Sequence, residues 1–488
     1  MPQITIPEIK REICIPSGTN LLQALTQAGI YPDAPCGGKG TCGKCKVRVD
    51  GQDVLACQTL VTRDMKVILP AAQIPQIIRE GILQDSAVVP LTEGYLLAFD
   101  IGTTTLVGYL LEEKTGRELA SVSRLNPQTA FGADVISRIQ AALHGAMSQL
   151  TVAVRDTLGE MVQILCAEGS ISPNRIGVIS VVGNPAMQQL FLGIDPNNLA
   201  AIPFAPVLTQ VERISCREIL PICPNAKLLI LPDISGYVGA DTLACLLATK
   251  LYEKEQITLL VDIGTNGEMV LGNKHRMIAC ATAAGPALEG ANIRHGMRAA
   301  PGAIDHVWLE NGEIQCSVIG GGKAAGICGS GLIDGISVGL KLGVLNKRGK
   351  ILRDDVQFYL TEDIPLTQED IRQVQLAKGA IHAGIILMAK ELGIQIRDIQ
   401  KVQLAGAFGS FLNPASACRM GLIPEELADR IEAVGNAAGS GAKMLACQED
   451  LLPVAQSLRD QVEFLELANL SDFPRTFARS MLFREECP

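Results

Sequence analysis

The sequence predicts a small α+β domain at the N-terminus, followed by a large α/β region built from two related halves. Three observations support this prediction. The first 70 residues alternate polar and apolar positions around a cysteine cluster, buried strands alternate with helices from residue 95 onward, and an Asp-x-Gly-Thr string occurs twice, 162 residues apart. At 488 residues the chain is too long for one core, and its 48% hydrophobic content is ample for buried sheets.

In the N-terminal region, the segments QITIPEI and REICI have the period of half-buried strands. Residues 17–20 supply a turn and a helix cap before LLQALTQAG, whose apolar residues have helical spacing. Further strands, in VRVDGQDVLAC and MKVILP, follow the cysteine loop. This order resembles that of a β-grasp ferredoxin, and we assign residues 1–70 to such a domain.

The remainder of the chain divides into a connection and a large region. Residues 71–94 contain two prolines and no clean period, so we expect a linker there. From residue 95, the segments YLLAFDIG, TLVGYLL, IGVISVVG, KLLILP, ITLLVDIG and VQLAGAF read as buried strands that alternate with helices. We expect mixed sheets covered by helices over 95–488, in halves of roughly 95–255 and 256–488.

Composition excludes several classes of protein. The chain has no run of about 18 apolar residues, which a membrane-spanning helix requires, and its first residues lack the apolar core of a signal peptide. A net charge of −9 disfavours nucleic-acid binding. We therefore expect a cytoplasmic protein that binds neither membranes nor nucleic acids, with its 15 cysteines reduced and available to ligate metal.

Four cysteines gather in a glycine-rich loop with the spacing Cys36-x5-Cys42-x2-Cys45-x11-Cys57. Four thiolates can hold two irons, two apiece, and the glycines let the loop wrap closely around them. A structural zinc site is the alternative, but such sites usually have two Cys-x2-Cys pairs and this loop has one. The loop resembles that of [2Fe–2S] ferredoxins, with a first gap of five residues instead of the plant-type four. We expect these four residues to hold a [2Fe–2S] cluster.

The repeated string points to phosphate binding. A strand that ends in Asp-x-Gly-Thr forms a tight turn whose amides and hydroxyls can face a polyanion, beside a carboxylate that can hold Mg²⁺ through water. The string occurs as FDIGTTT at residues 99–105 and as VDIGTNGE at residues 261–268, and a glycine loop, LAGAFG, spans residues 404–409. Together these segments resemble the phosphate-1, phosphate-2 and adenosine motifs of the actin, sugar-kinase and heat-shock ATPase superfamily.

That resemblance implies ATP and Mg²⁺ as ligands and gives individual residues their roles. Asp262 would lie near Mg²⁺, and Glu268 is a candidate to orient the attacking water, although it could equally be the partner of a local backbone amide. Gly406 and Gly409 would approach the adenosine. The residues implied at the two phosphate loops are Asp100, Gly102, Thr103, Thr104, Asp262, Gly264, Thr265 and Asn266.

The combination of this cysteine loop with these ATPase motifs resembles the reductive activators of corrinoid-dependent methyltransferases. The resemblance covers nearly the whole chain and includes the strings NPQ at 126–128, GADV at 132–135, GN at 183–184 and EGANIR at 289–294. It implies that an upstream low-potential donor reduces the cluster, and that ATP lets one electron return the cobalt of a corrinoid protein from Co(II) to Co(I). It is also compatible with a homodimer.

The chain departs from this family in two places. Only about two dozen residues separate the two regions where some members carry extra domains, and Gly183-Asn184 is followed by PAMQ where hydroxyl residues and a histidine are expected. If the loop at residues 183–188 contacts the partner protein, the partner specificity of this chain differs from that of other members of the family. Two segments have no assigned role: residues 282–294, around Glu289 and Arg294, and residues 327–331, where Ser330 either faces a ligand or caps a helix.

Three other functions fit parts of the sequence. An ATP-driven donor to another low-potential acceptor, in the style of dehydratase activators, would hold a [4Fe–4S] cluster between two subunits, with ligands inside the ATPase region. A small-molecule kinase with a redox-sensing ferredoxin domain would transfer phosphate without a reductant. A plain electron carrier with a degenerate ATPase half would bind no nucleotide.

Overall fold

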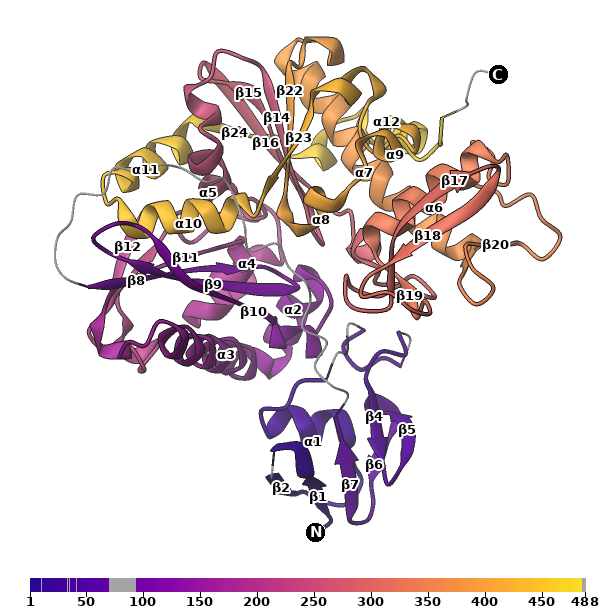
Figure 1. The fold of residues 1–488 in the computed structure, drawn as a ribbon. Helices are drawn as coiled ribbons and strands as arrows, with labels where there is room; N and C mark the ends of the chain where they lie inside the picture. The colour runs from indigo at the N-terminus through magenta and orange to yellow at the C-terminus, as the bar shows by residue number, and fades with distance from the viewer. Residues whose placement is uncertain (10, 33, 35, 41, 70–93, 485–488) are drawn as a thin grey trace.

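The computed structural model describes residues 1–9, 11–32, 34, 36–40, 42–69 and 94–484, and places a small N-terminal domain beneath a large two-sheet region (Figure 1). The expected linker over residues 71–94 lies outside the described residues, apart from Gly94. No helix in the described ranges is both long enough and apolar enough to cross a bilayer.

The N-terminal domain is a five-stranded sheet with one helix, as the sequence predicts. The strand order is β2-β1-β7-β4-β5, with β1 parallel to β7 and the other pairs antiparallel. Helix α1 (Leu21–Gln27) begins after Asn20, whose side chain accepts the amides of Leu22 and Gln23, so the predicted cap is confirmed. The strands of this sheet are β1 (Gln3–Ile6), β2 (Arg11–Cys14), β4 (Lys46–Val49), β5 (Gln52–Leu55) and β7 (Met65–Ile68).

The large region contains two six-stranded mixed sheets with the same plan. In each sheet, the strand that carries Asp-x-Gly is the first of a three-stranded antiparallel meander on one side and has two parallel strands on the other. Each sheet adds one edge strand outside this plan: Glu212–Ser215 in the first sheet is antiparallel to its neighbour, and Val462–Phe464 in the second is parallel to its neighbour. The first sheet, in spatial order, is β10 (Glu118–Leu125), β9 (Thr105–Glu112), β8 (Tyr95–Ile101), β11 (Ile176–Gly183), β13 (Lys227–Ile230) and β12 (Glu212–Ser215). The second is β23 (Ile431–Gly435), β22 (Lys401–Ala405), β14 (Thr258–Ile263), β15 (Gly267–Asn273), β16 (Arg276–Thr282) and β24 (Val462–Phe464).

Both faces of each sheet are covered, which is why the predicted strands are almost continuously apolar. In β8, Leu97 and Phe99 pack into the core under α3 (Met147–Glu168), while Leu96 and Ala98 face the opposite core. That second core also receives side chains from the other sheet, so it lies between the two sheets. The two halves therefore share one hydrophobic layer.

Two helices pack against each other in this shared layer, α5 (Ala240–Thr249) from the first half and α10 (Ala437–Cys447) from the second, and α11 (Leu451–Gln461) adds side chains to it. They pack so closely that a Cβ added at Gly441 would lie 2.1 Å from the carbonyl oxygen of Ala244. The two halves meet along this helix pair.

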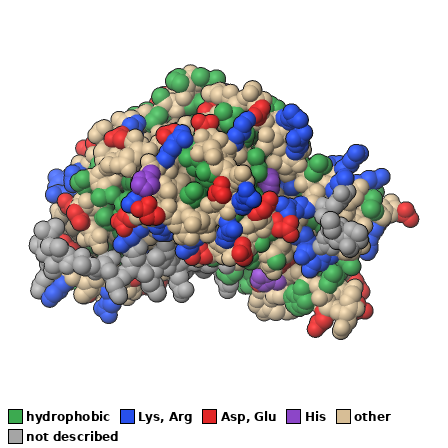
Figure 2. Space-filling model, turned by 90° about the horizontal axis from the view of Figure 1, so that it is seen from above, with side chains coloured by type: hydrophobic (Ala, Val, Ile, Leu, Met, Phe, Trp, Pro, Cys, Tyr) green, Lys and Arg blue, Asp and Glu red, His purple; other side chains and the backbone are tan. Residues whose placement is uncertain are grey.

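Helices also cover the outer faces of the two sheets (Figure 1). A small sheet in the second half was not predicted; its strand order is β18 (Glu313–Val318), β17 (Ala303–Glu310) and β19 (Gly326–Ile327). The outer helices include α2 (Val135–Ala141), α4 (Pro185–Leu192), α6 (Gly329–Lys341), α7 (Gln368–Leu392), α9 (Pro414–Arg419) and α12 (Phe473–Ser480). On the face seen in Figure 2, acidic and basic side chains are interspersed over the described residues.

Candidate functional site

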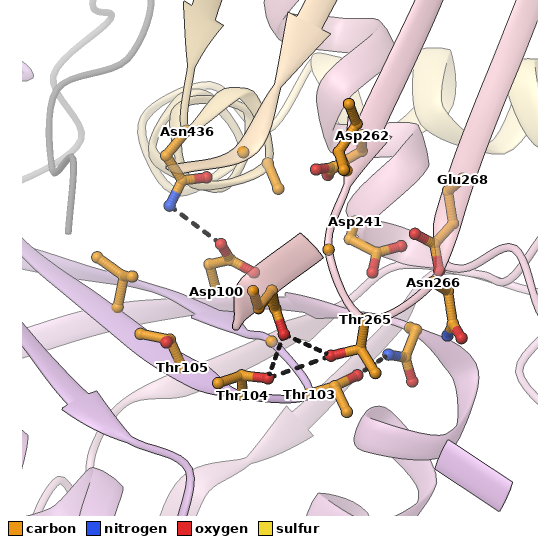
Figure 3. A pocket seen from close by; sticks show the side chains of 18 residues that line it. Asp100, Thr103, Thr104, Thr105, Asp241, Asp262, Thr265, Asn266, Glu268 and Asn436 are labelled. Carbon is orange, nitrogen blue, oxygen red and sulfur yellow. Dashed lines mark hydrogen bonds between the residues drawn. The ribbon is translucent and has the colours of Figure 1, made fainter. Parts of the chain in front are cut away.

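The two Asp-x-Gly-Thr turns face each other between the sheets. Asp100 lies in β8 and Asp262 in β14, which are corresponding strands of the two halves. The turns are in contact, because Oγ1 of Thr104 lies 3.1 Å from Oγ1 of Thr265 (Figure 3). The two predicted phosphate loops thus belong to one site.

A cavity of about 160 Å³ lies between the turns. Its lining includes every residue predicted for the phosphate loops, and also Glu268 and Gly406. The predicted Gly409 is not among the lining residues; it packs against Leu404, where an added Cβ would lie 3.0 Å from the leucine Cβ. The cavity is lined by Asp100, Gly102, Thr103, Thr104, Thr105, Val107, Asn184, Asp241, Asp262, Ile263, Gly264, Thr265, Asn266, Glu268, Glu289, Gly406, Asn436 and Ala438.

Gly406 brings a third segment of backbone to this cavity. It follows β22, which is parallel to β14 and so ends beside Asp262. Its φ of +82° is in the left-handed region, and an added Cβ would lie 2.7 Å from Oδ1 of Asp262. Only glycine therefore lets the chain turn here without pushing on the carboxylate.

The four predicted cysteine ligands lie together in the N-terminal domain as two pairs. Sγ of Cys36 and Sγ of Cys42 are 3.2 Å apart, and the amide of Cys57 donates to Sγ of Cys45 at 3.5 Å. Burial, followed by the neighbouring Cys45 thiol, raises the pKa of Cys57 to about 11. Crowded thiols of this kind give up their protons when a metal supplies positive charge.

The loop between these cysteines is shaped by glycine. All four of its glycines have φ values between +60° and +82°, a region that other residues adopt rarely. After burial, Cys45, Cys36 and Cys42 all contribute to raising the pKa of Cys57, so the four thiols are close neighbours. Two pairs of thiols suit two irons, two ligands apiece, better than one zinc ion with four. The glycines are Gly37, Gly38, Gly40 and Gly43.

Three protein-family models match successive parts of the chain. Residues 4–65 match a 2Fe–2S iron–sulfur cluster binding domain, residues 95–254 match the RACo middle region, and residues 256–487 match the C-terminal domain of RACo, the ASKHA domain. The corrinoid activation enzyme RamQ of Eubacterium limosum is 30% identical over 588 aligned positions, which cover 99% of both chains. The chain belongs to the RACo family of corrinoid activators.

Two further relatives support the same family. The [Co(II) methylated amine-specific corrinoid protein] reductase of Methanosarcina barkeri is 27% identical, over 75% of this activator and 73% of the relative. The solved structure of a reductive activator for corrinoid, iron–sulfur protein superposes with a TM-score of 0.76 at 28% identity, covering 100% of this chain and 99% of the other. The similarity thus extends over the complete fold.

Five carboxylates line the cavity of the activator, and no lysine or arginine is among its described lining residues. Burial, with the charge of Asp241 as the next cause, raises the pKa of Asp100 and that of Asp262 to about 7. The same two causes raise the pKa of Glu268 well above its usual value. This crowding of negative charge favours a cation as the missing partner.

The carboxylates are not arranged as a ready-made metal site. In the part of the chain that the structure describes, no three His, Cys, Asp or Glu side chains are placed to ligate one ion. Mg²⁺ usually keeps several waters and binds through one or two carboxylates together with substrate phosphates. The donor set therefore fits Mg²⁺ that arrives with a nucleotide, and fits a bare all-protein metal site poorly.

Two asparagines at the site were not predicted as ligand residues. The side chain of Asn436 donates to Oδ2 of Asp100 at 3.0 Å, and that of Asn184 donates to Oγ1 of Thr103 at 3.0 Å. Each follows a parallel strand and caps the next helix, α10 and α4 respectively. A second internal echo, Val-Gly-Asn at residues 182–184 and 434–436, is the signal that could have revealed this pair.

Asp241 and Glu289 are the other acidic residues that were not assigned. Asp241 is in the first turn of α5, with Oδ1 accepting the amide of Thr242 at 2.7 Å. Oε2 of Glu289 accepts the hydroxyls of both Thr104 and Thr265, each at 3.0 Å. The segment without an assigned role thus places a carboxylate between the phosphate loops.

The structure also places the two segments that the sequence left open. Residues 185–188, considered for partner contact, begin helix α4, and Gln188 is fully buried, while the preceding Asn184 lines the cavity. Ser330 neither caps α6, whose N-cap is Cys328, nor lines the cavity; its hydroxyl donates to the carbonyl oxygen of Asp305 at 2.8 Å. Ser330 and Gln188 therefore serve packing, whereas Asn184 belongs to the cavity.

Proposed function

We propose that this chain uses ATP to transfer one electron to the cobalt of a corrinoid protein, converting Co(II) to Co(I). The observation that carries this proposal is that a quartet of thiols and a carboxylate-lined cavity between two phosphate loops occur on one chain of the RACo family. When bound, a [2Fe–2S] cluster supplies a one-electron couple. Cys36, Cys42, Cys45 and Cys57 would hold it.

Each half of the large region would bind part of the nucleotide. The threonine hydroxyls and the backbone amides of the two turns would donate to phosphate oxygens, and Gly406, with Gly409 behind it, would shape the adenosine side. Asp262 would hold Mg²⁺ through water, and Glu268 would orient the water that attacks the terminal phosphate. Asp100 would support the same cation from the other half.

ATP is needed because the transfer to cobalt is uphill. For a one-electron couple, about 1.4 kcal/mol corresponds to about 59 mV. A few kcal/mol of nucleotide-linked conformational energy could therefore shift the difference between the reduction potentials of the cluster and the cobalt by on the order of 100–200 mV. An upstream low-potential donor would refill the cluster, and we place the reaction in the cytoplasm, where thiols stay reduced.

The test uses anaerobically purified holoprotein, a Co(II) corrinoid protein and a chemical reductant. We expect about two irons and two sulfides per chain, and conversion of the Co(II) absorbance spectrum to that of Co(I) only when MgATP is present. Cys45→Ser should abolish the conversion, whereas Cys14→Ser, at an exposed cysteine outside the cluster loop, should leave it unchanged. Zinc as the bound metal, or phosphate transfer to a metabolite without any reductant, would contradict the proposal.

A further inference from the structure

The N-terminal domain contacts both halves of the large region. Tyr31 stacks obliquely on Phe131 of the first half, with ring centroids 6.4 Å apart. Lys44 reaches the second half, where its Nζ donates to the carbonyl oxygens of Gly290 and Gly296 at 3.2 Å each. Since Lys44 lies between the ligands Cys42 and Cys45, this contact holds the cluster loop itself.

The segment that Lys44 binds is the one that enters the nucleotide cavity. Gly290 directly follows Glu289, whose carboxylate accepts both threonine hydroxyls of the phosphate loops. The segment also folds back on itself tightly, because a Cβ added at Gly296 would lie 2.0 Å from the carbonyl oxygen of Gly290. A shift of Glu289 therefore moves the two carbonyl groups to which Lys44 is bound.

The Glu289 contacts conflict with bound phosphate. A hydroxyl has one proton to donate, so while Thr104 and Thr265 donate to Glu289 they cannot donate to a phosphate oxygen. Phosphate is also negatively charged, as is the ionised carboxylate, and like charges at this distance repel. Nucleotide that uses these hydroxyls must displace the carboxylate.

We propose that Glu289 and Lys44 are positioning residues that couple nucleotide binding to docking of the cluster loop. Phosphate displaces the Glu289 carboxylate, and the backbone at Gly290 shifts with it. This shift breaks the hydrogen bonds from Lys44 to the carbonyl groups of the second half. The N-terminal domain is then free to carry its cluster to the corrinoid partner. This inference rests on the proposed nucleotide site. Because coupling between sites is reciprocal, release of Lys44 by mutation must strengthen nucleotide binding.

The test measures the affinity of the holoprotein for the non-hydrolysable analogue adenosine 5′-(β,γ-imido)triphosphate with Mg²⁺, by calorimetry. Lys44→Met should bind the analogue about fivefold more tightly or better, which is the lower end of the range usual for coupled sites. Lys44→Arg, which keeps the charge, should stay near the wild-type affinity. Lys39→Met is the matched control, because Lys39 is an exposed lysine of the same loop.

Hydrogen exchange of the peptide that carries residues 36–46 gives an independent readout. In the wild type, the analogue should increase exchange in this loop; in Lys44→Met, exchange should already be high and should not respond. Glu289→Gln, which lacks the repelling charge, should bind the analogue more tightly than the wild type. Equal affinities of Lys44→Met and Lys39→Met for the analogue would overturn the coupling. So would a wild-type loop whose hydrogen exchange does not change when the analogue binds. A wild type that does not bind the analogue at all would overturn the proposed function as well.

Discussion

The buried carboxylates determine the chemistry of the site at the residue scale. Burial raises the pKa of Asp241 to about 6, and burial followed by the charge of Asp241 raises the pKa values of Asp100 and Asp262 to about 7. No described basic side chain lines their cavity. Such crowding costs stability in the absence of ligand and becomes useful when a cation binds. The site is thus an example of local electrostatic strain that a ligand relieves.

Asp262→Asn tests this account. We expect the ligand-free protein to gain about 1–2 kcal/mol of unfolding free energy, because an amide removes one of the repelling charges. ATP hydrolysis should fall by on the order of 100-fold, because the carboxylate near Mg²⁺ is lost. Thermal unfolding and phosphate release measure the two effects, with exposed Asp354→Asn as the control. A variant that is less stable and still hydrolyses ATP would contradict the assignment.

The sequence was sufficient to indicate which residues meet at the cavity where those residues lie in one continuous turn. Asp100, Asp262 and Glu268 belong to short strings at the ends of apolar strands, so their placement follows from local structure. Asp241 and Asn436 reach the same cavity only because parallel strands place their carboxyl ends side by side. Because Asp241 and Asn436 are far from the two turns in the sequence, their place in the cavity could be recognised only from the topology of the sheets.

At the scale of elements, the helix pair α5 and α10 joins the two halves. Gly441 is the point of closest approach, where the α10 backbone lies against the carbonyl of Ala244. The repeated motif and the apolar strands were sufficient to predict two related α/β halves. The small sheet over residues 303–327 was not predicted, since only three of the eight residues of β17 are buried, β18 has no buried residue and β19 has only two residues.

Gly441→Ala should destabilise this junction. The added methyl group overlaps a backbone atom that cannot move without shifting α5, so we expect a loss of about 1–3 kcal/mol. Gly159→Ala, in the middle of α3 with open space around it, should be neutral or stabilise by up to about 1 kcal/mol. Chemical unfolding of both variants is the measurement. Equal unfolding free energies for the two variants would show that the contact between α5 and α10 tolerates an added methyl group.

Helix α7 carries a second testable feature, a buried lysine. Nζ of Lys378 donates to the carbonyl oxygen of Leu482 at 2.5 Å and lies over the ring of Phe483. Burial, with Arg484 as the second cause, lowers the pKa of Lys378 to about 7. His382, one turn further along α7, has its pKa lowered to about 4, chiefly by burial and then by Lys378 and Arg484.

The sign of the pH effect follows from this shift. Between about pH 7 and 10.5 the unfolded chain binds a proton at Lys378 that the folded chain does not, so stability rises with pH across this window. The contribution is lost as pH falls from 10.5 to 7 and changes little below pH 7, where both states are protonated. Relative to Lys378→Met, the wild type should gain about 3–4 kcal/mol of unfolding free energy between pH 7 and pH 10. Lys341→Met, at an exposed lysine, is the control. A difference independent of pH would refute the shifted pKa.

For the whole molecule, a cluster domain contacts both halves of an ATPase region whose nucleotide cavity lies between them (Figure 1). Local sequence patterns predict the two regions, because each region carries its own motif. The contact between them was not predictable, since Lys44 and Gly290 are 246 residues apart and nothing in their separate motifs indicates that the two residues meet. The central claim is that the two regions act in one reaction.

Freeze-quench electron paramagnetic resonance tests that claim most directly, because the reduced cluster and Co(II) each give a signal whereas the oxidised cluster and Co(I) give none. Pre-reduced holoprotein is mixed with a Co(II) corrinoid protein, with and without MgATP. We predict that the two signals disappear together, one cluster for each cobalt, and only when MgATP is present. Loss of the Co(II) signal at the same rate without nucleotide, or with the cluster signal unchanged, would contradict the account.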